Sequence, residues 1–165
     1  MKKSFLSLIY VLVMMMFMVA CANSGENESN PTSDHNMEAT TYEIINNFDG
    51  VTMTIKESSI SSNGLTVIIE NDSNKECIFG EFFVLEKKID DSWYQVPVEI
   101  EGDYGFEDIG YELESGGSRE WKTDWEWLYG SLDVGQYRIV KDILDFREAG
   151  DYDKYYLGAE FILYE

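Results

Sequence analysis

The chain has 165 residues, of which 32 are Asp or Glu and 12 are Lys or Arg, giving a formal net charge of −20. A chain this negative lacks the basic surface that binds phosphate backbones, so nucleic-acid binding is excluded. Hydrophobic residues make up 44% of the sequence and aromatic residues 15%, too many for a chain that is disordered throughout. The length fits one folded domain with short appendages.

The first 20 residues are typical of a secretory signal. Lys2 and Lys3 precede an uncharged apolar run over residues 5–20, which is shorter than the ~20 residues of a membrane-spanning helix. The residues Val19-Ala20-Cys21 that close this run resemble the bacterial lipobox, in which the cysteine thiol receives a diacylglyceryl group and the signal is cut before it. We therefore expect a lipoprotein signal peptide over 1–20 and lipidation of Cys21. An uncleaved membrane anchor and an ordinary signal with a chance cysteine are the alternatives.

The next segment, residues 21–45, is predicted to be a flexible polar tether. Residues 22–41 are rich in Asn, Ser, Glu and Thr and contain no aromatic residue. A coil of about 20 such residues has an r.m.s. span of roughly 25 Å. We expect the protein to be held at the extracytoplasmic face of the cell membrane by the lipid on Cys21.

The remaining residues, 46–165, are predicted to form one all-β domain. Apolar and polar residues alternate with period 2 in short segments separated by turn residues. Seven strands are expected, over residues 51–56, 65–69, 79–88, 93–98, 118–124, 137–141 and 157–163. This number of strands predicts an antiparallel two-layer sandwich. The connection over residues 99–117 is long enough to contain another short strand.

One local pattern gives the sandwich a more specific character. Leu132, Gly135 and Tyr137 have the spacing L-x-x-G-x-Y. In immunoglobulin (Ig)-like sandwiches a tyrosine at this place bonds through its hydroxyl to backbone a few residues upstream, forming the tyrosine corner. We expect Gly135 to permit the tight entry into the strand and Leu132 to cover the core.

Two longer segments carry a resemblance to a known family. They are W-Y-x-V-P over residues 93–97 and G-x-Y-R-I-V over residues 135–140. Over residues 49–164 the sequence looks like the bacterial Ig-like domains of secreted proteins and lipoproteins. The resemblance implies an Ig-like fold, with Trp93 and Trp121 as structural residues, and an envelope location. It implies no reaction and no catalytic residue. The arrangement is more distantly similar to bacterial intracellular proteinase inhibitors.

Exposed aromatic side chains are the first candidate binding residues. Such side chains stack on sugar rings or anchor a protein partner. The candidates are Trp125, Trp127, Tyr129, Tyr104 and Phe106. The alternative is that Trp121 lies in the core and the other members of the run 125–129 pack the loop before the tyrosine corner.

Metal binding and catalysis have little support in the sequence. Acidic residues cluster over 99–117, but no calcium-loop pattern is present, so their expected role is solubility and repulsion from anionic wall polymers. His35, the only histidine, lies in the predicted tether, where it has no partner for catalysis. Cys77 is expected to be a buried small apolar residue. No metal, cofactor or enzymatic activity is expected.

The sequence therefore predicts a monomeric, membrane-anchored lipoprotein whose Ig-like domain binds an envelope partner, either a protein or a cell-wall glycan. Two more specific alternatives remain open at this point. One is an inhibitor or regulatory subunit of an envelope enzyme, and the other is a glycan-binding module that uses the aromatic residues.

Overall fold

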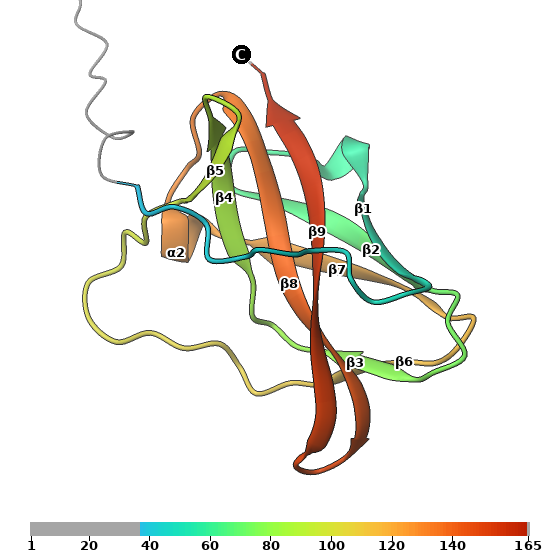
Figure 1. Ribbon diagram of the computed structural model, residues 1–165. Coiled ribbons are helices and arrows are strands. Elements are labelled where there is room, and N and C mark those ends of the chain that lie inside the picture. Colours follow the sequence, from blue (N-terminus) through green and yellow to red (C-terminus); the bar gives the residue numbers. More distant parts are fainter. Residues whose placement is uncertain (1–36, 165) are drawn as a thin grey trace, which may run out of the picture. The chain divides into compact units, whose positions relative to one another are not determined.

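The computed structural model describes residues 37–164, which form two antiparallel sheets packed face to face (Figure 1). The smaller sheet has the order β1-β2-β7 and consists of β1 (Val51–Ile55), β2 (Gly64–Asn71) and β7 (Ser118–Asp124). The larger sheet has the order β5-β4-β8-β3-β6, and β9 pairs with the other side of β8. Its strands are β3 (Cys77–Phe79), β4 (Val84–Ile89), β5 (Ser92–Gln95), β6 (Tyr111–Leu113), β8 (Gly135–Glu148) and β9 (Asp151–Leu163). The protein is an all-β Ig-like sandwich, as the sequence predicts.

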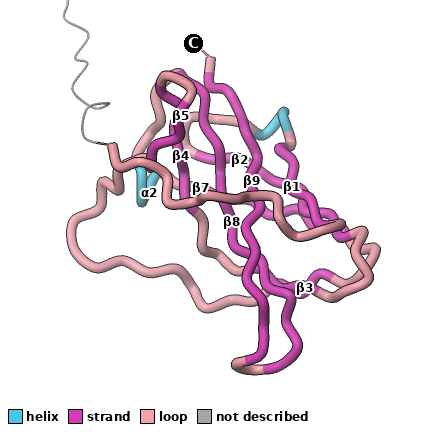
Figure 2. The backbone as a smooth tube through the Cα atoms, in the orientation of Figure 1, coloured by secondary structure: helices cyan, strands magenta, loops and turns pink. Residues whose placement is uncertain are grey.

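The strands differ from the prediction in several places. The last two, β8 and β9, extend well beyond the predicted residues 137–141 and 157–163 and form one long hairpin. The predicted strand over residues 79–88 is divided between β3 and β4, because the carbonyls of Gly80 and Phe82 accept hydrogen bonds from Lys141 Nζ at 2.7 and 3.0 Å. The long connection after β5 does contain a further short strand, β6. Figure 2 shows this connection as a wide loop that leaves β5 and returns at β6. Two short elements complete the fold, a 3-10 turn η2 (Glu57–Ser59) and a one-turn helix α2 (Glu126–Tyr129).

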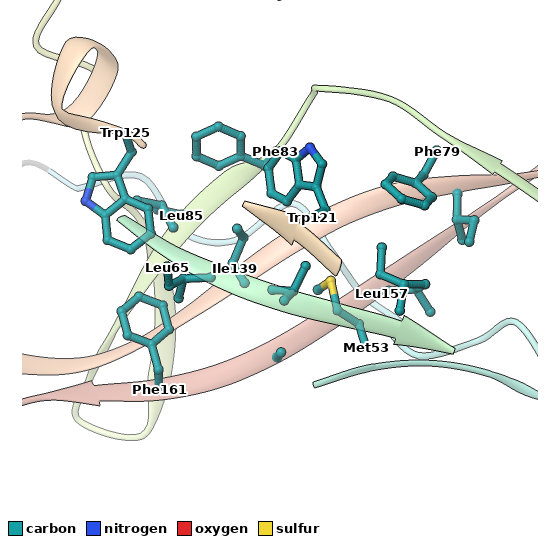
Figure 3. Packing of buried hydrophobic residues seen from close by; sticks show 14 of the residues in the cluster. Met53, Leu65, Phe79, Phe83, Leu85, Trp121, Trp125, Ile139, Leu157 and Phe161 are labelled. Carbon is teal, nitrogen blue, oxygen red and sulfur yellow. The ribbon is translucent and has the colours of Figure 1, made fainter. Parts of the chain in front are cut away.

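The core lies between the two sheets and is built from aromatic and aliphatic side chains (Figure 3). Trp121 and Phe83 meet edge to face with ring centroids 5.8 Å apart, and Trp125 lies at the same distance from Phe161. Cys77 is a buried free thiol, and burial raises its pKa to about 11. The thiol is therefore an apolar core group, as expected.

Residues 38–47, which we call the strap, run across the outer face of the larger sheet (Figure 1). At one end Thr40 N donates to Trp93 O at 3.0 Å, which joins the strap to β5. At the other end the Asn46 side chain accepts from Gly158 N at 2.9 Å and donates to Gly158 O at 3.1 Å, which joins it to β9. Within the predicted tether, the backbone of Glu38 and Thr40 thus pairs with β5, and the Tyr42 ring contacts Tyr156 of β9, so this part of the segment lies against the domain.

The hydrogen bond that defines a tyrosine corner is present at the start of β8. Tyr137 Oη donates to Asp133 O at 3.1 Å. Leu132 is buried beside it. A Cβ atom on Gly135 would lie 3.2 Å from Cε2 of the Tyr137 ring, so glycine lets the ring lie against the backbone.

We expect Tyr137→Phe to lower the free energy of unfolding by about 1 kcal/mol, because the Asp133 carbonyl loses its donor while the ring still fills the core. Urea unfolding followed by tryptophan fluorescence measures the change. Tyr152→Phe, at an exposed position on β9, is the control and should leave the midpoint unchanged. Equal stability of wild type and Tyr137→Phe would show that this corner bond contributes nothing.

Candidate functional site

Three aromatic residues form a contiguous, partly exposed group, which we call the aromatic surface. It consists of Tyr104, Phe106 and Trp127, whose ring centroids lie 5.8 to 6.5 Å apart in edge-to-face contacts. Tyr104 and Trp127 are 48% and 46% exposed, and Phe106 is half-buried. The fold thus brings together three of the five aromatic candidates predicted from the sequence.

The prediction that Trp125 and Tyr129 are exposed binding residues is wrong, because both side chains are buried. Trp125 is 0% exposed and its indole Nε1 donates to Ser62 O at 2.8 Å, while Tyr129 is 5% exposed. Both belong to the turn of α2, in which Trp125, Leu128 and Tyr129 share the face toward the core. Trp127 lies on the opposite face of the same turn and therefore reaches solvent.

The loop between β5 and β6 is held against the domain, so the aromatic surface has a fixed base. Glu99 N donates to Leu128 O at 2.9 Å, which ties the start of the loop to α2. Phe106 packs against Phe83 of the core at 5.6 Å and against Phe82 at 5.4 Å. Phe82 is itself 40% exposed and continues the apolar surface.

A cleft of about 500 Å³ adjoins the aromatic surface at Phe82 and Phe106. Four carboxylates line it: Glu81, Glu107, Asp108 and Asp142. Glu81 accepts hydrogen bonds from the Tyr111 hydroxyl and from Trp121 Nε1. Glu107 and Asp108 are exposed and make no ion pair within the described residues. The cleft therefore combines apolar walls with unneutralised negative charge.

A buried lysine, not identified from the sequence, holds the wall of this cleft. Lys141 is 0% exposed, and its Nζ bonds to the carbonyls of Gly80 and Phe82 and lies 3.5 Å from the centroid of the Trp121 ring. Burial lowers the pKa of Lys141 to about 7, although Asp142 and Glu81 act in the opposite direction. The sequence signal was a charged residue between Ile139 and Ile143, at an inward position of β8.

A second buried polar group lies under the strap on the outer face of the larger sheet. Arg138 Nε and Glu86 Oε2 are 2.5 Å apart, and the two residues face each other in the register of β4 and β8. Arg138 Nη2 also donates to Thr40 Oγ1 of the strap at 3.2 Å, and its guanidinium lies 4.5 Å from the Trp93 ring centroid. Glu86 Oε1 is buried with no hydrogen-bond partner within the described residues.

The two tryptophans expected to be structural have different environments. Trp121 is buried in the core, whereas Trp93 is partly exposed and packs beneath Arg138. The predicted signal peptide, Cys21 and His35 lie outside the described residues. Between residues 37 and 164 no cluster of potential metal ligands is found, and no helix there is long and apolar enough to cross a membrane.

Comparison with known proteins agrees with this description. No similar curated protein and no similar solved structure was found. Residues 46–162, most of the described sandwich, match the family model described as a bacterial Ig-like domain. The chain belongs to the bacterial Ig-like domain family.

Proposed function

We propose that the protein is a lipid-anchored, extracytoplasmic binding protein whose Ig-like domain holds an envelope partner at the aromatic surface, without catalysis. Membership of the bacterial Ig-like domain family supports an interaction module at the cell surface or outside the cell. The sequence Val19-Ala20-Cys21 at the end of the apolar N-terminal run supports anchoring through a lipid on Cys21.

The observation that carries the proposal is the exposure of aromatic rings on a fixed base. Tyr104 and Trp127 remain about half exposed although the core of the domain is closed without them. Aromatic residues in contact with one another at a surface are typical anchors of binding interfaces, because they bury large areas at a small cost in conformational entropy. Phe106 holds the pair against the core through Phe83.

The test measures binding of the full chain, kept in detergent, to two preparations: detergent-solubilised envelope proteins and purified cell wall. We expect Trp127→Ala to weaken retention about tenfold, as for an anchor at the centre of an interface. Tyr152→Ala is the matched control, because Tyr152 has nearly the same exposed fraction, 47% against 46%, and lies on β9. Equal retention of Trp127→Ala and wild type would exclude the aromatic surface as the binding site.

A further inference from the structure

The aromatic surface lies in the most acidic part of the described chain. No Lys, Arg or His occurs between Lys88 and Arg119. The loop and β6 carry seven exposed acidic residues in this interval, which are Glu99, Glu101, Asp103, Glu107, Asp108, Glu112 and Glu114. Within residues 37–164 none of the seven makes an ion pair.

Several carboxylates elsewhere in the domain do have cationic partners. Lys56 pairs with Glu120 at 2.8 Å, and Lys154 pairs with Asp142 at 3.0 Å. Arg147 bridges several carboxylates of the β8–β9 hairpin. Arg119, next to this interval in the sequence, lies over the Tyr111 ring and donates to the backbone carbonyl of Glu112, not to a carboxylate. Within the described residues, the ion pairs therefore leave the seven carboxylates around the aromatic surface without a cationic partner.

Exposed rings surrounded by carboxylates fit one kind of ligand chemistry. The face of an indole or phenol ring attracts a cation, and a neighbouring carboxylate adds a charge-assisted hydrogen bond. A guanidinium or ammonium group on an apolar stem satisfies both, because the stem covers the rings while the charge meets the carboxylates. A neutral sugar would leave the charges unused, and an anionic wall polymer would be repelled.

We propose that the occupant of the aromatic surface is an Arg- or Lys-bearing segment of a basic protein partner. This inference rests on the proposed function and specifies the class of partner. The cationic side chain lies over Trp127 or Tyr104, and the carboxylates that flank the aromatic residues of the loop, Asp103 and Glu107, receive its charge.

The experiment uses the full chain in a zwitterionic detergent and defined probes. They are a short peptide of alternating Arg and Gly, its Lys-Gly and Gln-Gly counterparts, and a chitin oligosaccharide, each titrated calorimetrically at low and at physiological salt. We expect the Arg-Gly and Lys-Gly peptides to bind, the Gln-Gly peptide and the oligosaccharide not to bind, and the affinity to fall as salt rises.

The variants separate this surface from the overall charge. Trp127→Ala is expected to lower the affinity for the Arg-Gly peptide about threefold or more, and so is the double variant Asp103→Asn/Glu107→Gln. The control, Glu70→Gln/Asp72→Asn, removes the same charge from two exposed acids at and just after the end of β2, which make no ion pair within residues 37–164, and should have a smaller effect.

Equal weakening by the two double variants would overturn the inference, because binding would then follow net charge alone. So would preferential binding of the oligosaccharide that requires Trp127 but ignores the carboxylates, although that result would support the proposed function. If Trp127→Ala alters neither peptide binding nor envelope retention, both the inference and the proposed function fail.

Discussion

Replacing Arg138 with Met is expected to lower the free energy of unfolding by about 3–5 kcal/mol, the range for removing one partner of a buried ion pair. The cause is Glu86, whose side chain is 0% exposed and already has one oxygen without a hydrogen-bond partner in the described structure. Without the guanidinium at 2.5 Å, the whole carboxylate would be buried unpaired. Urea unfolding at neutral pH measures the loss.

Two further variants identify the origin of this loss. The double variant Glu86→Leu/Arg138→Met should recover most of the stability, since no buried charge remains. Lys154→Met breaks an exposed pair with Asp142 and should cost less than about 1 kcal/mol. A double variant as unstable as Arg138→Met would mean instead that the main contribution of Arg138 is its contact with the strap and with Trp93.

The second large effect concerns pH, through the buried Lys141. Its pKa is about 7 in the folded protein, against an ordinary value of 10.5. Between these two values the unfolded chain binds a proton that the folded protein does not, so this lysine makes stability rise with pH. We therefore expect the free energy of unfolding of wild type, minus that of Lys141→Met, to rise by about 1.4 kcal/mol per pH unit in that window. Below pH 7 its contribution to the slope vanishes.

Unfolding of both proteins is measured at several pH values from neutral to mildly alkaline, so that groups common to both cancel. Lys122→Met serves as the control, because Lys122 is exposed on β7 and its removal should leave the slope unchanged. A difference between wild type and Lys141→Met that does not vary with pH would mean that the ammonium stays charged in the fold. The carbonyls of Gly80 and Phe82 and the Trp121 ring would then be sufficient to hold it.

The sandwich was predictable because apolar and polar residues alternate along its strands. Val51 and Met53 in β1, like Val67 and Ile69 in β2, are buried at alternate positions, so each segment carries its own signal. The tyrosine corner was predictable because it too is local in sequence: Tyr137 and its acceptor Asp133 are only four residues apart.

The aromatic run of α2 was harder because one helical turn is too short to show a period. Trp125, Leu128 and Tyr129 have the i, i+3, i+4 spacing of one helix face, which would have separated them from the exposed Trp127. Without an assigned helix, the sequence alone does not separate the buried Trp125 and Tyr129 from the exposed Trp127.

The buried polar groups could not be predicted, because their partners come from distant parts of the chain. Lys141 bonds to carbonyls 61 and 59 residues away, and the pairing of Glu86 with Arg138 depends on the register of β4 against β8. The same is true of the contact between Tyr104 and Trp127, which requires the loop after β5 to return to α2. Composition and period describe segments, whereas these contacts depend on their assembly.

The strap also has a consequence for the behaviour of many copies at one surface. A long outer strand such as β9 offers backbone groups to which a strand of a neighbouring molecule could add, the usual route to edge-to-edge aggregation. Asn46 occupies the N–H and C=O of Gly158 with its side-chain amide, and the start of the strap does the same along β5. Anchoring at a membrane, as proposed above, would bring such edges close to one another. The strap keeps these positions occupied and so blocks the addition of a strand there.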